Sequence, residues 1–164
     1  MSNKGVVVFM NYATNVKNIV EWFLHNMPMT HKKLQKLLYF SYGFYLAQNN
    51  NDVNNLENFL FVNNFEAWVH GPVDPTIYNI FKNNGVNLLY MENTTTFKFD
   101  EKIMNALNIT MEKYGKMNAD ELEYESHIQL PWKNARNGIA ETDISNSKLQ
   151  DEDIYLTFKE LLHE

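Results

Sequence analysis

The strongest constraint on the fold is the stretch HKKLQKLLYFSYGFYLAQ, residues 31–48. Tyr39, Phe40 and Phe44 lie outside its main apolar stripe, so the predicted helix is apolar on almost every side. A helix of this kind is either surrounded by other elements or exposes a second apolar face to a partner. We expect the central position. The stripe itself has helical spacing and consists of Leu34, Leu37, Leu38, Tyr42, Tyr45 and Leu46.

Shorter helical patterns lie on both sides of this stretch and are separated by turn residues. Pro28 ends the first pattern, and Gly85 ends another. Asn118 and Glu121 have the spacing of a capping box, which indicates a helix start. The predicted helices cover residues 16–27, 30–48, 75–85 and 100–115, a short segment from 118, a turn from 131 and a last helix that includes 154–162.

Extended structure is predicted in two places. Residues 59–69, FLFVNNFEAWV, carry aromatic and β-branched residues around an Asn-Asn pair, which favours a small hairpin. Residues 88–99, LLYMENTTTFKF, favour two more short strands. With no internal repeat and no Pro/Ser-rich linker, the chain is predicted to form a mainly α, single compact domain over residues 1–164, with a minor antiparallel β element.

Composition and charge restrict the function classes. The chain has no cysteine, which excludes disulfides, thiolate nucleophiles and zinc–thiolate sites. Residues 1–48 hold five lysines and one glutamate, a net +4, which leaves −10 for the remainder of a chain whose net charge is −6. Arg136 is the sole arginine, and arginine makes most bidentate contacts to bases and phosphates, so nucleic-acid binding is not expected. An acidic protein with one basic corner suits a protein partner.

No segment of the sequence is typical of membrane insertion or export. Its apolar runs are shorter than the ~20 residues that a spanning helix needs. The first residues, MSNKGVVVFMN, lack the length and the small-residue cleavage site of a secretion signal. We therefore expect a cytoplasmic protein that makes no membrane contact.

His70, in the stretch FEAWVHGPVDP, is the residue that most invites a catalytic interpretation. Catalysis would need a nucleophile, a carboxylate or a metal within hydrogen-bond reach, and the neighbouring Gly71 and Pro72 together favour a sharp corner instead. We interpret His70 as part of a structural turn that hydrogen-bonds nearby backbone. The alternative is an enzyme that uses His70, Glu66 or His127. Neither a metal nor a cofactor is expected, because no metal-ligand spacing links the histidines His25, His31, His70, His127 and His163.

Two oppositely charged segments are candidate contacts for a partner. HKKLQK, residues 31–36, places Lys32, Lys33 and Lys36 in the first turns of a helix, where the helix dipole disfavours positive charge. DELEYE, residues 120–125, places Glu121 and Glu125 on one helical face. Each run is interpreted either as solvated surface or as a landing site for a partner of opposite charge.

Trp68 and Trp132 each lie beside turn residues. A large aromatic side chain in such a place either holds a loop against the core or anchors an interface. We favour the structural interpretation for Trp68, and for Trp132 both interpretations stay open.

Three separated motifs occur in one order: MTHKKLQKLLYFSYGFYLAQ at 29–48, FEAWVHGPVDPTIYNIFKNNG at 65–85, and HIQLPWKNARNG at 127–138 followed by IS at 144–145. In identity and spacing they resemble the Panacea domain family, also called SocA-like or phage-associated GepA-like. The resemblance extends from about residue 14 to 160. The matching residues are Leu34, Lys36, Leu37, Leu38, Tyr39, Ala67, Trp68, Gly71, Pro72, Val73, Pro131, Trp132, Ala135 and Arg136. The family often has tyrosine at the position of His70, which supports the structural interpretation of that residue.

The resemblance implies a mainly helical fold with no catalytic centre, and a function as an antitoxin that neutralises a toxin encoded next to it by direct binding. It implies a protein partner, and in one variant of the function delivery of the toxin to a AAA+ protease. The alternative is a phage-encoded inhibitor or modulator of a host defence or regulatory protein. The motif residues are then either structural or part of an interface.

Overall fold

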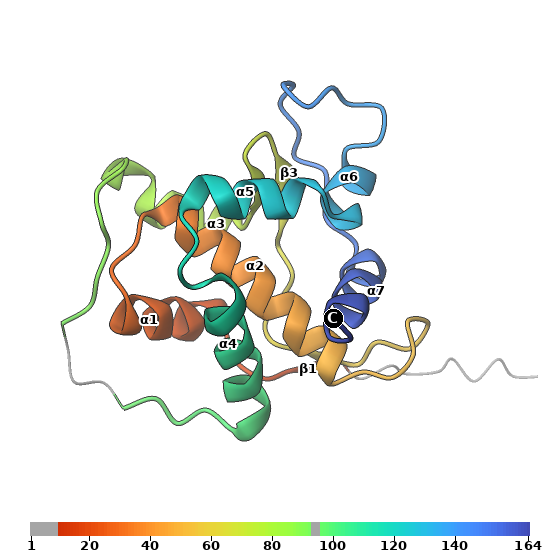
Figure 1. The fold of residues 1–164 in the computed structure, drawn as a ribbon, viewed down its shortest axis with the longest axis horizontal. Coiled ribbons are helices and arrows are strands. Elements are labelled where there is room, and N and C mark those ends of the chain that lie inside the picture. The colour runs from red at the N-terminus through yellow and green to blue at the C-terminus, as the bar shows by residue number, and fades with distance from the viewer. Residues whose placement is uncertain (1–9, 93–95) are drawn as a thin grey trace, which may run out of the picture.

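A long central helix, α2 (His31–Gln48), organises the structure, a computed structural model that describes residues 10–92 and 96–164. Every residue of α2 from Leu34 to Ala47 is buried, which confirms the central position expected from its sequence. The side chain of Thr30 caps its first turn by accepting a hydrogen bond from the backbone N–H of Lys33. Figure 1 shows α2 running through the middle of the molecule, with the other elements around it.

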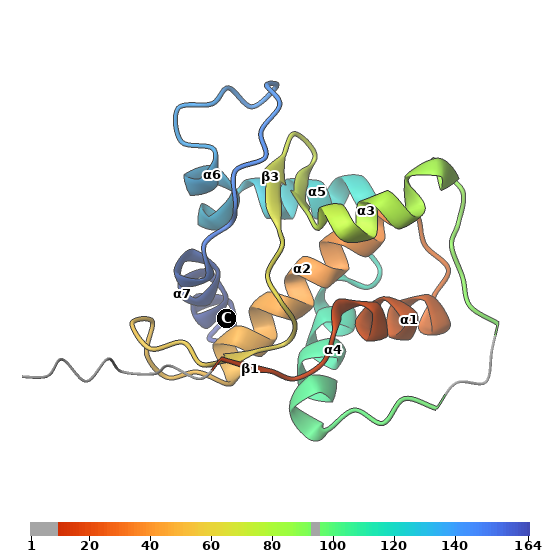
Figure 2. The same ribbon diagram turned by 180° about the vertical axis from the view of Figure 1, so that it is seen from behind.

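Six further α-helices surround α2 in the described part of the chain. The most extensive contacts of α2 are with α4 and α7. In Figure 1, α4 and α5 lie in front of α2, and in the reverse view of Figure 2, α1 and α3 face the viewer. The predicted capping box is present, with reciprocal hydrogen bonds between Asn118 and Glu121. The helices are α1 (Val16–Asn26), α3 (Pro75–Phe81), α4 (Glu101–Tyr114), α5 (Ala119–His127), α6 (Leu130–Ala135) and α7 (Asp151–Leu161), with a 3-10 turn η1 (Lys82–Asn84) after α3.

Aromatic rings fill the space between α2, α4 and α7. The ring of Phe40 stacks on Tyr114 with centroids 4.0 Å apart, and Phe44 meets Phe158 edge to face at 4.9 Å. Gly43 lies opposite Phe158, and a Cβ atom there would overlap the Phe158 ring. The absence of a side chain at Gly43 therefore lets α7 pack directly against the backbone of α2.

Two small sheets complete the fold. β1 (Asn11–Tyr12) pairs in parallel with β2 (Asn58–Phe59), and β3 (Glu66–Trp68) pairs antiparallel with β4 (Gly71–Val73). The predicted antiparallel element is confirmed, and the parallel pair was not predicted. The predicted position of the hairpin, at residues 59–69, is wrong, because the hairpin occupies 66–73.

The side chain of Asn63 explains this difference. It accepts a hydrogen bond from the backbone N–H of Phe65 and donates to Leu149 O and to the carboxylate of Asp151. Asn63 therefore ties the connection between β2 and β3 to the start of α7, and the Asn-Asn pair does not turn a hairpin. These partners are 86 and 88 residues away in the sequence, where no local pattern reveals them.

The predicted strands at residues 88–99 are absent where the structure describes this stretch. Leu89 alone forms an isolated bridge, exchanging backbone hydrogen bonds of 2.7 and 3.0 Å with Met29. Residues 93–95, which belong to the same prediction, lie outside the described residues. None of the helices within 10–92 and 96–164 is long and apolar enough to cross a membrane.

We expect Gly43→Ala to destabilise the protein, although alanine normally favours a helix over glycine by about 1 kcal/mol. The added methyl overlaps Phe158, and overpacking of this kind typically costs about 1–3 kcal/mol. Urea denaturation followed by circular dichroism measures the change in the free energy of unfolding. The double variant Gly43→Ala/Phe158→Leu is the control: its loss should be smaller than the sum of the two single losses, and an additive result would contradict the packing argument.

Candidate functional site

The three sequence motifs converge on the β3–β4 hairpin. Because the hairpin is short, several of its backbone carbonyls have no strand partner and must find other donors when they are buried. The donors come from α2, from α6 and from the residue that follows α6, all far away in the sequence, so the hairpin is attached on two sides. We call these side chains the hairpin donors: Lys36 Nζ to Pro72 O at 3.0 Å, Trp132 Nε1 to Trp68 O at 2.8 Å, and Arg136 Nη1 to Ala67 O at 2.7 Å.

The exit of the hairpin is attached to α2 by the side chain of Gln35. Its amide nitrogen donates to Asp74 O at 3.0 Å, and its amide oxygen accepts from the backbone N–H of Asp74 at 2.8 Å. The carboxylate of Asp74 accepts from the backbone N–H groups of Thr76 and Ile77 and caps α3. Gln35 thus sets the position at which the chain leaves β4 and begins α3.

Gly71 occupies a position that only glycine fits. Its φ of 99° lies in the left-handed region that side chains disfavour. A Cβ atom there would be 2.7 Å from Ser126 Oγ and 2.8 Å from Lys36 Cε. The glycine therefore permits both the turn after His70 and the close approach of α2 and α5 to the hairpin.

Lys36 is a buried cation with an exposed fraction of 1%. Burial lowers the pKa of Lys36 to about 7, an effect that the negative charge of Glu123 opposes and the positive charge of Lys32 reinforces. None of the described carboxylates forms an ion pair with Lys36. Close to neutral pH this amine is therefore divided between its charged and neutral forms.

Arg136 connects the hairpin to the segment that follows α6. Its Nη2 donates to Ala140 O at 2.7 Å and to Asp143 O, while Nη1 bonds the hairpin. The guanidinium also lies over the ring of Trp132, 5.0 Å from the centroid. The His127 ring stacks on Trp132 as well, at 3.9 Å. The third motif thereby holds residues 140–143 beside β3, and the backbone N–H of Ala67 in β3 donates to Ser147 O at 2.8 Å.

The remaining motif residues are parts of the core and of helix starts. Leu34 and Leu37 are fully buried in α2, and Pro131 lies in the first turn of α6. Tyr39 is buried, and its hydroxyl donates to Gln129 Oε1 at 2.9 Å. Val73, in β4, lines an open groove.

Most of the predicted partner-contacting charges have partners inside the chain. Lys32 Nζ lies 2.7 Å from the carboxylate of Asp120 and also pairs with Glu123. Lys33 Nζ donates to Gly115 O at 2.6 Å, the side chain of Glu121 accepts from the backbone of its own capping box, and Glu125 is half-buried. The basic and acidic runs therefore face each other across α2 and α5, and their role toward a partner stays a prediction.

His70 and Glu66, two of the residues that an enzyme would use, each contact a different side chain. The side chain of His70 is 71% exposed, and its Nδ1 lies 3.1 Å from Glu123 Oε1 rather than against nearby backbone. Glu66 accepts a hydrogen bond of 2.7 Å from Trp68 Nε1. Within 10–92 and 96–164, no three His, Asp or Glu side chains are grouped so that they could hold a metal ion.

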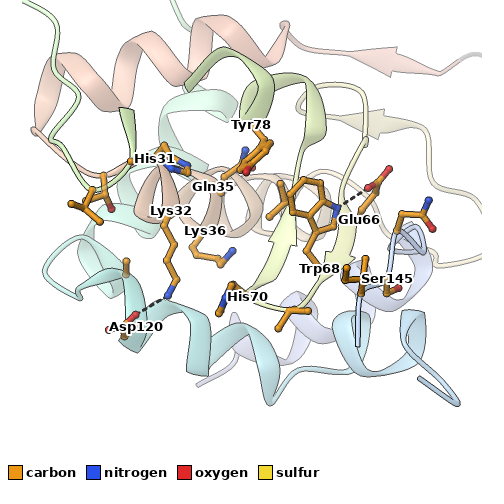
Figure 3. Close-up of a pocket in the computed structure, with 18 residues that line it drawn as sticks. His31, Lys32, Gln35, Lys36, Glu66, Trp68, His70, Tyr78, Asp120 and Ser145 are labelled. Atoms are coloured by element: carbon orange, nitrogen blue, oxygen red, sulfur yellow. Dashed lines mark hydrogen bonds and ion pairs between the residues drawn. The ribbon is translucent and has the colours of Figure 1, made fainter. Parts of the chain in front are cut away.

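A groove of about 850 Å³ lies along the hairpin, between the first turns of α2, the middle of α3, residues 85–86, the start of α5 and residues 144–146. Figure 3 shows Lys36 in this groove between Lys32 and Trp68, with Tyr78 and Ser145 farther along the walls. Two aliphatic side chains at its border, Val86 and Ile144, are 88% and 93% exposed. The surfaces that line it are mainly apolar and come from Trp68, Val69, Val73, Tyr78, Val86 and Ile144.

Sequence reasoning identified five residues that line this groove: Lys32, Lys36, Trp68, His70 and Val73. It missed the apolar residues Val69, Tyr78, Val86 and Ile144 as site residues. One local signal was present: Ile144 is an isolated aliphatic residue in the polar stretch ETDISNS. Val69 and Tyr78 belong to the second motif, at residues 65–85, but nothing in the local pattern shows that their side chains line a groove.

Comparisons with known proteins identify the family of the chain. The profile of the family described as "Antitoxin SocA-like, Panacea domain" matches residues 34–133. This chain belongs to that family. The Panacea match begins in α2, includes the whole hairpin and ends in α6, so it contains the hairpin donors Lys36 and Trp132, while Arg136 lies three residues beyond it.

The chain is also similar to the protein named Antitoxin SocA from Caulobacter vibrioides (strain NA1000 / CB15N). The two are 30% identical over 127 residues, which is 69% of this chain and 63% of the relative. This Panacea protein therefore spans less than two thirds of the length of the curated relative it matches. No solved structure matches the chain.

We expect Gly71→Ala to destabilise the protein by roughly 3 kcal/mol, because backbone strain adds to the overlap with Lys36 and Ser126. Gly138→Ala is the matched control: Gly138 also has a positive φ, 79°, but no atom lies within 4 Å of a Cβ there. Its loss should be only about 1–2 kcal/mol. Chemical denaturation of both variants measures the difference, and equal losses would contradict the role assigned to close approach.

The pKa of Lys36 predicts a pH-dependent stability. An unfolded lysine binds its proton up to a pH of about 10, whereas the folded protein releases this one near pH 7. Between these values the unfolded state binds more protons, so the free energy of unfolding rises with pH. From about pH 7.5 to about pH 9.5, we expect the wild type to gain roughly 2–3 kcal/mol more than Lys36→Met. Urea titrations at several pH values test this, and identical slopes for the two proteins would show that Lys36 does not titrate in this range.

Proposed function

We propose that this protein is an antitoxin that neutralises a partner toxin by direct protein–protein contact, and that the groove along the hairpin is the contact site. The family supports the antitoxin function, since a relative carries that name. The observation that supports the location is the pair of almost fully exposed aliphatic side chains, Val86 and Ile144, on the border of an apolar groove. Exposed apolar surface of this kind marks interaction sites in soluble proteins.

The walls of the groove are held rigidly before any partner arrives. The hairpin donors attach β3 and β4 to α2 and α6, and Arg136 also fixes residues 140–143 beside Ile144. A rigid surface loses little conformational entropy on binding, so more of the contact energy appears as affinity. Complete burial of an exposed Val or Ile contributes roughly 1.5–3 kcal/mol each. Two such residues can therefore dominate an interface of at least ~1,000 Å².

The test begins with the protein encoded by the neighbouring gene as the candidate toxin. Expressed alone it should arrest growth, and co-expression with this antitoxin should restore growth and yield a complex in a pull-down. The half-life of the toxin then separates two modes of neutralisation: it is unchanged or longer if the antitoxin occludes the toxin, and shorter if the antitoxin delivers it to a AAA+ protease. A harmless neighbour that forms no complex contradicts the proposal.

We expect the double variant Val86→Asp/Ile144→Asp to weaken the complex by about 100-fold or more, because two apolar contacts are lost and two charges must be desolvated. Both side chains are exposed, so the stability of the free antitoxin should change little. Leu156→Asp is the control, since Leu156 is 49% exposed on α7 and does not border the groove. Isothermal titration calorimetry and growth rescue give the readouts. If the control weakens the complex as much as the double variant, the contact site lies elsewhere.

A further inference from the structure

The charged groups around the groove form pairs inside the chain, with one exception. Lys32 pairs with Asp120 and Glu123, and His70 pairs with Glu123. Glu66 pairs with Lys148 at 3.7 Å and accepts the hydrogen bond from Trp68. Lys36, in the same groove, has no carboxylate partner in the described part of the chain.

The amine of Lys36 also has unused hydrogen-bonding capacity. A lysine ammonium has three N–H donors, and Lys36 uses one for Pro72 O. Lys36 lines the groove although only 1% of the residue is exposed, and in the described part of the chain Pro72 O is the hydrogen-bond partner of its Nζ. Burial of a charge is unfavourable unless the charge is paired and hydrogen-bonded. A carboxylate that entered the groove would meet both needs through charge-assisted hydrogen bonds.

On the basis of the proposed function, we propose that the groove takes an apolar segment of the partner protein that carries one carboxylate, and that this carboxylate binds Nζ of Lys36. The carboxylate comes from an Asp or Glu side chain or from the C-terminus of the partner, since both present the same chemistry. A protein segment fits better than a small molecule, because Val86 and Ile144 project into solvent and only an occupant that extends over the border covers them.

The near-neutral pKa of Lys36 is consistent with this assignment. The charged groups that act on its amine are Lys32 on its own helix and Glu123 on α5, and the neighbouring His127 has its pKa lowered by burial. Of these, only Glu123 is acidic, and it already pairs with Lys32 and His70. An added carboxylate next to Nζ would favour the ammonium form, so binding should take up protons at a pH slightly above 7.

A peptide library gives a probe that does not require the toxin. Random 12-residue peptides are displayed in two formats, one with a free C-terminus and one with the C-terminus fused, and selected on the wild-type protein. We expect the selected peptides to combine apolar residues with Asp or Glu in the fused format, or with a terminal carboxylate in the free format. The format that yields the tighter groove binders identifies the source of the carboxylate. Loss of binding to Val86→Asp/Ile144→Asp locates the peptide in the groove.

A double-mutant cycle on the tightest synthetic peptide then tests the contact with Lys36. Replacing its carboxylate by an amide should weaken binding to the wild type by at least tenfold and should have little effect on binding to Lys36→Met. Lys36→Gln is a second variant, which keeps a donor for Pro72 O without the charge. Lys113→Met removes an exposed lysine of α4 outside the groove and should bind as the wild type does. Circular dichroism confirms that each variant is folded.

Several outcomes overturn the inference. These are a library without groove-dependent binders, binders that lack an acidic group, or an equal effect of the amide on wild type and Lys36→Met. Concentration-dependent dimerisation that Ile144→Asp abolishes would assign the groove to a second copy of this chain instead. The inference and the proposed function fail in different experiments. If Val86→Asp/Ile144→Asp weakens the toxin complex but Lys36→Met does not, only the carboxylate contact is refuted. If neither variant weakens the complex, the groove is refuted as the contact site.

Discussion

The backbone carbonyls of the β3–β4 hairpin need hydrogen-bond donors that the hairpin itself cannot supply. Lys36 from α2, Trp132 from α6 and Arg136, the residue that follows α6, provide them at 2.7–3.0 Å. An unpaired buried carbonyl is costly, so these three bonds hold elements that are 36 to 69 residues apart in the sequence in one arrangement. The groove follows from this arrangement, since its walls are the hairpin and the elements attached to it. The three motifs of the Panacea family are thereby explained as one structural unit.

Lys36 supports the fold, and it is also the side chain that we propose binds a carboxylate of the partner. Its aliphatic part packs against Gly71, and its amine supports β4, yet it has no counter-charge within the described residues. Burial dominates the distant attraction of Glu123, which is why the pKa falls instead of rising. Lys32, four residues earlier, is only partly buried and has two acidic partners. The same residue type in neighbouring turns of one helix therefore has two different electrostatic roles.

The local patterns predicted the helices well and the β structure poorly. The caps and stop residues act over three or four positions, so Asn118, Glu121 and Gly85 behave as their spacing indicated. The hairpin was placed too early, because Asn63 bonds to Leu149 and Asp151 instead of turning the chain. The sequence also left the role of the two charged runs open, because their partners in the fold lie far away in the chain. Lys32 and Asp120 are 88 residues apart, and whether they meet each other or a partner depends on how α2 packs against α5.

The sequence by itself favoured a central position for α2, because a helix with apolar residues on almost every side must bury them against other elements or against a partner, and the burial of Leu34 to Ala47 decided for the centre. The sequence also determined where the helices start and end, and, through three motifs in register, the family. Only the tertiary structure decided that these motifs meet at one hairpin, that His70 faces Glu123, and that Val86 and Ile144 border a common groove. The physical reason is range: helix periodicity and capping depend on neighbours within one or two turns, whereas buried donors, ion pairs and grooves depend on the packing of distant segments.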